Sequence, residues 1–207
     1  MSNLQLQVGG LTPLTTIDYP GELAAVIFCQ GCPWSCRYCH NSHLLPRSGD
    51  GLIEWASVID FFKQRRGLLD AVVFSGGEPT LQRNLKPAIQ QVRTMGFKIG
   101  LHSAGAYPER LAELLPLLDW VGLDIKALPG DYDTLTGVSG SGGKARESLQ
   151  LLVASGVAYE IRTTVHPELL TPAVLKQLDS RLLETGVLNH QLQKCNTGHC
   201  LDTTLTA

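Results

Sequence analysis

The chain has 207 residues and a formal net charge of −2, and its isoelectric point is near 6.3. It carries no lysine and arginine cluster long enough for many phosphate contacts, which argues against nucleic acid as a partner. No apolar run approaches the roughly 20 residues that span a bilayer, and the N-terminus lacks the basic and apolar regions of a signal peptide. We therefore expect a cytoplasmic protein without membrane contact, with a single domain over residues 1–207.

The first 23 residues contain two turn signals, Gly9-Gly-Leu-Thr-Pro13 and Asp18-Tyr-Pro-Gly21. Because glycine and proline favour turns over long elements, we expect residues 1–23 to be an extension that wraps the edge of the following loop. From Ala24 onward a short apolar strand, a loop and an amphipathic helix alternate. Strands are predicted at 24–28, 71–74, 97–101, 120–124, 158–165 and 190–193, and helices near 53–66, 81–95, 107–117, 144–155 and 171–185.

This alternation predicts an α/β fold with a parallel sheet and right-handed crossovers, open or partly closed into a barrel. Six strands are too few for an eight-stranded barrel, so we expect a partial (β/α)6 TIM-like barrel over residues 24–193, followed by a tail over 194–207. Pro87 would interrupt a helix that began at residue 81, and a start near Asn84 removes the conflict. In such sheets ligands bind beyond the C-terminal ends of the strands.

The first predicted strand is followed by four cysteines within eleven positions, Cys29, Cys32, Cys36 and Cys39. Thiolates select zinc, copper(I) or iron-sulfur clusters. Zinc ribbons separate their two cysteine pairs by about 15–20 residues, whereas only three residues intervene here. Counted from Cys32, the C-x3-C-x2-C spacing gives three ligands to a four-iron cluster and leaves one iron open. A structural zinc site and an electron-transfer cluster are the alternatives.

Polar residues also follow the second and third predicted strands. The second ends in Ser75-Gly-Gly-Glu-Pro-Thr80, where paired glycines allow a ligand to approach the backbone and Glu78 supplies a carboxylate. By itself a double glycine is more often a tight turn. The third strand ends in His102-Ser-Ala-Gly105. We favour a hydrogen-bonded structural role for His102 over a catalytic one.

The fourth and fifth predicted strands contribute charged residues. Asp124 and Lys126 share one strand face. They either neutralise each other or bind a ligand, and we favour the ligand. Arg162 lies in a strand rich in β-branched residues, where a charge is costly to bury without a partner. It is therefore a candidate carboxylate anchor, with a structural pair to Glu160 as the alternative.

The C-terminal tail contains Cys195-Asn-Thr-Gly-His199-Cys200. Two thiols and one imidazole are one ligand short of a tetrahedral metal site. We interpret Cys195 and Cys200 as reactive or tail thiols rather than as metal ligands.

The combination of Cys32-x3-Cys36-x2-Cys39 with Gly76-Gly-Glu78 at the end of the next strand resembles the radical S-adenosylmethionine (SAM) enzymes. The chain is most similar to the activating proteins of anaerobic ribonucleoside-triphosphate reductases, and the resemblance extends over nearly its whole length. It includes the segment from Gly10 to Gly21 and Leu123-Asp-Ile-Lys126.

The resemblance implies that Cys32, Cys36 and Cys39 ligate a 4Fe-4S cluster and that Cys29 does not. It also implies that electrons come from a flavodoxin-like donor and that the partner is the large subunit of an anaerobic ribonucleotide reductase, on which a glycyl radical is generated. The implied SAM-binding residues are Tyr38 against the adenine, Gly76, Gly77 and Glu78 at the methionine end, and Ser103, Asp124, Lys126 and Arg162 around the rest.

One departure from the family concerns the third strand. Related activases carry Asp-Thr-Asn-Gly or a similar sequence after it, where this chain has His102-Ser-Ala-Gly105. The alternatives within the same chemistry are another glycyl radical protein or a small-molecule substrate, as in deazapurine-synthesising enzymes. An iron-sulfur or zinc module that acts without SAM is the alternative outside it.

Overall fold

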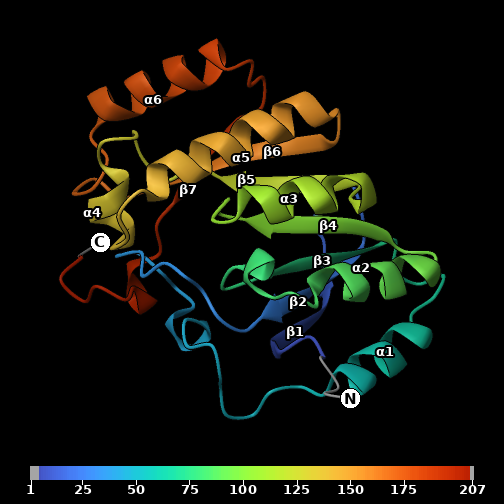
Figure 1. Cartoon of the computed structure of the whole chain (residues 1–207). Helices are drawn as coiled ribbons and strands as arrows, with labels where there is room; N and C mark the ends of the chain where they lie inside the picture. Colours follow the sequence, from blue (N-terminus) through green and yellow to red (C-terminus); the bar gives the residue numbers. More distant parts are fainter. Residues whose placement is uncertain (1–4, 206–207) are drawn as a thin grey trace.

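A single mixed sheet organises the part of the chain that the computed structural model describes, residues 5–205 apart from the side chain of His199. Its strands follow the order of the chain, β1-β2-β3-β4-β5-β6-β7 (Figure 1). The strands are β1 (Val8–Thr15), β2 (Ala24–Cys29), β3 (Ala71–Gly76), β4 (Lys98–Ser103), β5 (Trp120–Asp124), β6 (Ala158–Val165) and β7 (His190–Lys194). The pairs from β2 to β7 are parallel, which confirms the predicted run of six parallel strands.

The N-terminal strand β1 corrects the expectation that residues 1–23 hold no long element. It pairs antiparallel with β2, and its register shifts between Val8 and Gly10 and again between Thr12 and Thr15. The glycines and Pro13 therefore interrupt the pairing without preventing the strand. An edge strand tolerates proline because one side of its backbone has no partner strand to bond.

The five predicted helices are present: α1 (Trp55–Lys63), α2 (Leu85–Thr94), α3 (Pro108–Leu114), α5 (Ser141–Ser155) and α6 (Pro172–Glu184). All are shorter than predicted except α5, which begins three residues earlier than expected. In α2 the N-cap is Asn84, and Pro87 lies in the first turn, as predicted. The short helix α4 (Tyr132–Thr136) was not predicted. Its five residues are too few to produce a helical periodicity in the sequence.

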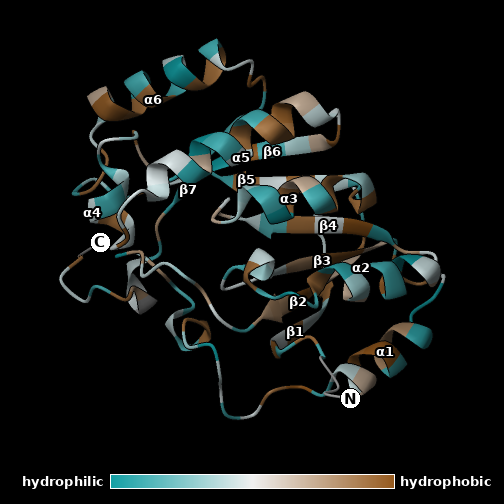
Figure 2. Cartoon of the chain, in the orientation of Figure 1, coloured by the Kyte–Doolittle hydropathy of each residue, from teal (hydrophilic) through white to brown (hydrophobic). Residues whose placement is uncertain are grey.

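The main core lies between the helices and one face of the sheet. Alternate strand residues such as Ile27, Phe74 and Leu101 pack there with Phe62 of α1 and Leu152 of α5. Figure 2 shows this pattern as brown central strands beneath helices with brown and teal sides. Each helix thus buries one apolar stripe, which is the usual arrangement of a helix layer on a sheet.

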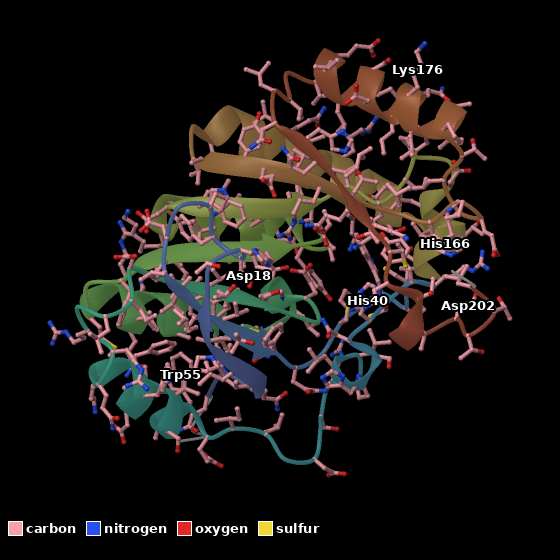
Figure 3. The ribbon with its side chains drawn as sticks, turned by 180° about the vertical axis from the view of Figure 1, so that it is seen from behind. Asp18, His40, Trp55, His166, Lys176 and Asp202 are labelled. Carbon is pink, nitrogen blue, oxygen red and sulfur yellow. The ribbon has the colours of Figure 1, made fainter. Side chains whose placement is uncertain are left out.

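The opposite face of the sheet holds a smaller apolar cluster. Val26, Val73 and Trp120 point to this side, and Tyr19 covers them from the loop between β1 and β2. The Tyr19 and Trp120 rings are 5.3 Å apart between centroids. In Figure 3 this loop, marked by Asp18, crosses the sheet on the face away from the helices. The N-terminal segment therefore fills the inside of the partial barrel.

The sheet does not close on itself among the described residues, because β1 and β7 pair on one side only. An unclosed sheet agrees with the partial barrel predicted from sequence. No described helix has the length and apolar character needed to cross a membrane.

Candidate functional site

A cavity of about 190 Å³ opens at the C-terminal ends of the parallel strands. This is where ligands bind in sheets of this kind. The cavity brings together residues that lie near the C-terminal ends of five strands, β2 to β6, or directly after them. Its lining comprises Cys32, Trp34, Cys36, Tyr38, Cys39, His40, Asn41, Leu45, Ser75, Gly76, Gly77, His102, Ser103, Ala104, Asp124, Lys126, Arg162 and Thr164.

The cysteine loop that follows β2 is held by its own backbone. Gly31 N donates to Leu44 O at 2.7 Å, and Cys32 N donates to Leu45 O at 3.1 Å. This loop places Cys32, Cys36 and Cys39 on the cavity. Cys29 is the last residue of β2, is fully buried and does not line the cavity. Only the three predicted cluster ligands therefore face the site.

The spacing of these thiols distinguishes a cluster from a single ion. In a tetrahedral zinc site with Zn–S bonds of about 2.3 Å, two sulfurs lie about 3.8 Å apart. Among the described residues, Cys32, Cys36 and Cys39 do not form a set with all ligand atoms within 4.8 Å of one another. The three thiols are therefore not gathered around one point, as they would be around a single ion, and a cluster takes thiolates on separate irons.

Gly76 and Gly77 allow the end of β3 to lie directly against the cysteine loop. A Cβ atom on Gly76 would lie 2.4 Å from Cys29 N, and one on Gly77 would lie 2.3 Å from Gly31 O. Gly76 also has a φ of +117°, which a side chain disfavours. Both glycines line the cavity. They are therefore needed to pack two backbones together, besides any contact with a ligand.

The Glu78 side chain is completely buried and is not part of the cavity lining. Its Oε1 accepts hydrogen bonds from Thr80 N at 3.1 Å and Ser103 Oγ at 2.9 Å, and its Oε2 accepts one from Ala104 N at 2.8 Å. Burial raises the pKa of Glu78, although these hydrogen bonds oppose the shift. The carboxylate joins the end of β3 to the end of β4.

Asp124 forms the centre of a charged group on the cavity wall. Its Oδ1 lies 3.0 Å from Arg162 Nη2, and its Oδ2 lies 3.4 Å from Lys126 Nζ. Burial alone would raise the pKa of Asp124, but the charges of Arg162 and Lys126 outweigh it and lower the pKa. Asp124 and Lys126 therefore form the ion pair that was the alternative to ligand binding, and Arg162 pairs with Asp124 instead of Glu160.

The aromatic wall of the cavity contains a buried polar atom. The Tyr38 hydroxyl is the one side-chain oxygen or nitrogen among the described residues that is buried without a hydrogen-bond partner. Lys126 Nζ lies 5.5 Å from the centroid of the Tyr38 ring, within range of a cation–π contact. An unpaired buried hydroxyl costs free energy. A ligand with polar groups in this cavity would remove that cost, so the lining fits SAM.

His102 connects the end of β4 to the N-terminal segment. Its Nε2 is 2.8 Å from Asp18 O, and its Nδ1 is 3.3 Å from Ser75 Oγ. Arg162 Nη1 lies 3.2 Å from the same Nε2. Burial and the Arg162 charge lower the pKa of His102 to about 4. A neutral ring with hydrogen on Nε2 donates to Asp18 O and accepts at Nδ1 from Ser75 Oγ, and the Arg162 Nη1 contact is then an approach of two donors and not a hydrogen bond. These contacts agree with the structural role favoured from sequence.

Eight lining residues were not among the site residues predicted from sequence: Trp34, His40, Asn41, Leu45, Ser75, His102, Ala104 and Thr164. His40 directly follows Cys39 of the cysteine motif, and Thr164 lies on the same strand face as Arg162. Both residues could therefore have been predicted as site residues from their sequence positions. Ala104 has no polar side chain, so its residue type gave no signal of a place in the site.

The C-terminal tail packs on the cysteine loop. Leu201 N donates to Cys39 O at 3.0 Å, and Asp202 N donates to Arg37 O at 2.8 Å. The Arg37 and Asp202 side chains form an ion pair at 2.8 Å. Figure 3 shows this segment beside His40. The tail is thus an integral part of the wall around the cysteines.

Comparison with known proteins adds independent findings. The model of the radical SAM superfamily matches residues 26–170. A putative glycyl-radical enzyme activating enzyme of Methanocaldococcus jannaschii is 34% identical over 172 residues, or 79% of this chain and 70% of that protein. The pyruvate formate-lyase-activating enzyme of Clostridium pasteurianum is 28% identical over 169 residues, with the same coverage of both chains.

Solved structures agree at the level of the fold. Streptococcus suis SuiB bound to S-adenosylmethionine matches with a TM-score of 0.65 at 13% identity, over 83% of this chain. The match covers 40% of the SuiB chain, so more than half of SuiB lies outside the matched region.

Proposed function

Because the chain belongs to the radical SAM superfamily, whose members use a 4Fe-4S cluster and SAM, we propose that it activates a glycyl radical enzyme. The observation that carries this proposal is the cavity in which Cys32, Cys36 and Cys39 face the charged group of Asp124, Lys126 and Arg162. Three thiolates leave one iron of a 4Fe-4S cluster free for a small ligand. Two relatives support the choice of reaction: the name of one specifies activation of a glycyl-radical enzyme, and the name of the other specifies activation of pyruvate formate-lyase.

In this proposal the three thiolates hold the cluster, and the opposite wall positions SAM. Lys126 and Arg162 provide positive charge for a carboxylate, and Asp124 provides an acceptor for hydroxyl or ammonium groups. Tyr38 offers an aromatic face for the adenine and a hydroxyl that lacks a protein partner among the described residues. When bound, the cluster and SAM supply an electron and a 5'-deoxyadenosyl radical that abstracts hydrogen.

The remaining SAM-binding assignments concern the loops after β3 and β4. Gly76 and Gly77 present backbone to the cavity, where they can accept the methionine ammonium. Ser103 lines the cavity and also donates to Glu78. We propose that Glu78 acts through Ser103 and Ala104 by fixing these loops, because its carboxylate does not face the cavity. This differs from the direct contact expected from sequence.

For the partner, we propose the large subunit of an anaerobic ribonucleotide reductase, with a flavodoxin-like protein as electron donor. The support is the resemblance of the segment from Gly10 to Gly21 to the activating proteins of those reductases. In the structure this segment continues from β1 to the loop that carries Tyr19. It places Leu14 and Ile17, which are 57% and 86% exposed, at the surface. Exposed apolar side chains of this kind suit a protein contact.

The test is electron paramagnetic resonance under anoxic conditions. The reconstituted, reduced protein is mixed with SAM and an anaerobic ribonucleotide reductase large subunit from the same source. A glycyl radical doublet on the reductase is the expected result, and Cys36→Ala should abolish it. Release of 5'-deoxyadenosine without the doublet would retain the radical chemistry and reject this partner. With neither product, the activase proposal would fail.

A further inference from the structure

Three potential metal ligands from distant parts of the chain meet beside the cysteine loop. Cys195 Sγ lies 3.6 Å from Cys200 Sγ and 3.7 Å from His40 Nε2. All three ligand atoms lie within 4.8 Å of one another, and no other set of three or more such ligands does so among the described residues. Both cysteines are buried, while His40 is exposed. His40 supplies an imidazole from outside the tail, on the residue that follows Cys39.

The distances match those of a single ion. Tetrahedral zinc with Zn–S bonds of about 2.3 Å and Zn–N bonds of about 2.05 Å places two sulfurs about 3.8 Å apart, and sulfur and nitrogen about 3.5 Å apart. The observed 3.6 and 3.7 Å are close to these values. Two thiolates and one imidazole are soft and intermediate ligands, which favour zinc over magnesium or calcium.

The surrounding structure holds the three residues in place without an ion. Cys195 N donates to Val165 O at 2.9 Å at the end of β7, which fixes the start of the tail. Leu201, next to Cys200, donates to the Cys39 carbonyl, and Cys39 precedes His40. Backbone hydrogen bonds thus position both sides of the site, and an ion would add a link between them.

We propose that His40, Cys195 and Cys200 bind one zinc ion that fastens the C-terminal tail to the cysteine loop. Both thiols lose their protons to solvent when the ion binds, and water completes the four-coordinate site. The site is separate from the cluster ligands, but His40 is adjacent to Cys39 in the chain. Zinc therefore stabilises the part of the loop that carries the last cluster ligand.

The experiment must exclude zinc at the cluster cysteines. The full chain with Cys32→Ser, Cys36→Ser and Cys39→Ser is purified with zinc, and bound zinc is measured by plasma mass spectrometry. About one zinc per chain is expected from this three-ligand site. Adding His40→Ala should weaken zinc binding at least tenfold, and adding Cys195→Ser with Cys200→Ser should abolish it. His43→Ala, an exposed histidine of the same loop, is the matched control and should retain zinc.

A second measurement covers the case in which the triple variant fails to fold. The otherwise unchanged chain is reconstituted with iron, sulfide and zinc under anoxic conditions, and both metals are counted with and without Cys195→Ser and Cys200→Ser. Loss of zinc with retention of iron supports the site. Absence of zinc from the unchanged chain, or equal zinc in the tail variant, would overturn it, and so would a disulfide between the two tail cysteines in place of the ion. Neither readout depends on glycyl radical formation.

Discussion

Asp124 and Arg162 lie directly opposite each other in the parallel register of β5 and β6, and two guanidinium nitrogens of Arg162 contact Asp124 Oδ1. The two side chains are 33% and 11% exposed. The space for the guanidinium comes from Gly122, where a Cβ atom would lie 2.9 Å from Arg162 Cζ. The pair therefore depends on strand register and on a glycine in the neighbouring strand.

Replacing Asp124 should destabilise the protein even without cofactors. Asp124→Asn leaves the positive charges of Arg162 and Lys126 without their carboxylate, and we expect a loss of about 2 kcal/mol in the free energy of unfolding. Urea denaturation of the apoprotein measures this. Asp60→Asn is the control, because its pair with Lys63 is exposed and should contribute less than about 1 kcal/mol. Equal losses in the two variants would contradict a special role for the partly buried pair of Asp124 and Arg162.

Cysteine substitutions should distinguish the cluster ligands from Cys29, which does not line the cavity. After anoxic reconstitution we expect about four irons per chain in the unchanged protein and in Cys29→Ala. Cys36→Ala should hold little or no iron, because a cluster with two thiolates is poorly retained. Iron and sulfide analysis checks both variants. Loss of iron in Cys29→Ala would make Cys29 a fourth ligand and leave no open iron for SAM.

The contact between the glycine loop and the cysteine loop should not tolerate a methyl group. Gly77→Ala would place Cβ 2.3 Å from Gly31 O, so the cysteine loop must move. We expect a loss of about 1–3 kcal/mol in unfolding free energy and weaker SAM binding by calorimetry. Gly143→Ala, in the exposed start of α5 with no atom near the added Cβ, is the matched control. It should cause little change or a small gain.

The buried imidazole of His102 should make stability depend on pH. Its pKa is lowered from 6.5 to about 4 by burial and by Arg162. Between about pH 4 and 6.5 the imidazole of the unfolded chain binds a proton that the folded chain does not. The unfolding free energy therefore rises with pH over this range, and the contribution of His102 is lost as the pH falls through it. The contribution is at most roughly 3 kcal/mol.

Unfolding measured from pH 4 to 7 tests this dependence. His102→Gln should have a smaller slope than the unchanged protein, whereas the exposed His43→Ala should keep the full slope. An identical slope in His102→Gln would assign the pH dependence to other groups.

Local sequence patterns were enough for much of the fold. The alternation of apolar strands and amphipathic helices gave six parallel strands and five of the helices, because both periodicities are local properties of the chain. Pro87 was placed correctly by the same kind of reasoning. The strand β1 was missed because glycine and proline signal turns locally, while pairing with β2 overrides them.

By itself, the sequence determined which functional groups are present and near which strands they lie: a tight C-x3-C-x2-C loop, a glycine pair at the end of the next strand, and charged residues at the ends of later strands. Only the tertiary structure decided which groups meet. It turned Glu78 away from the cavity, paired Arg162 with Asp124 across strands, and brought His40 to Cys195 over 155 positions. Such contacts depend on register and chain crossing, and no short-range pattern carries that information.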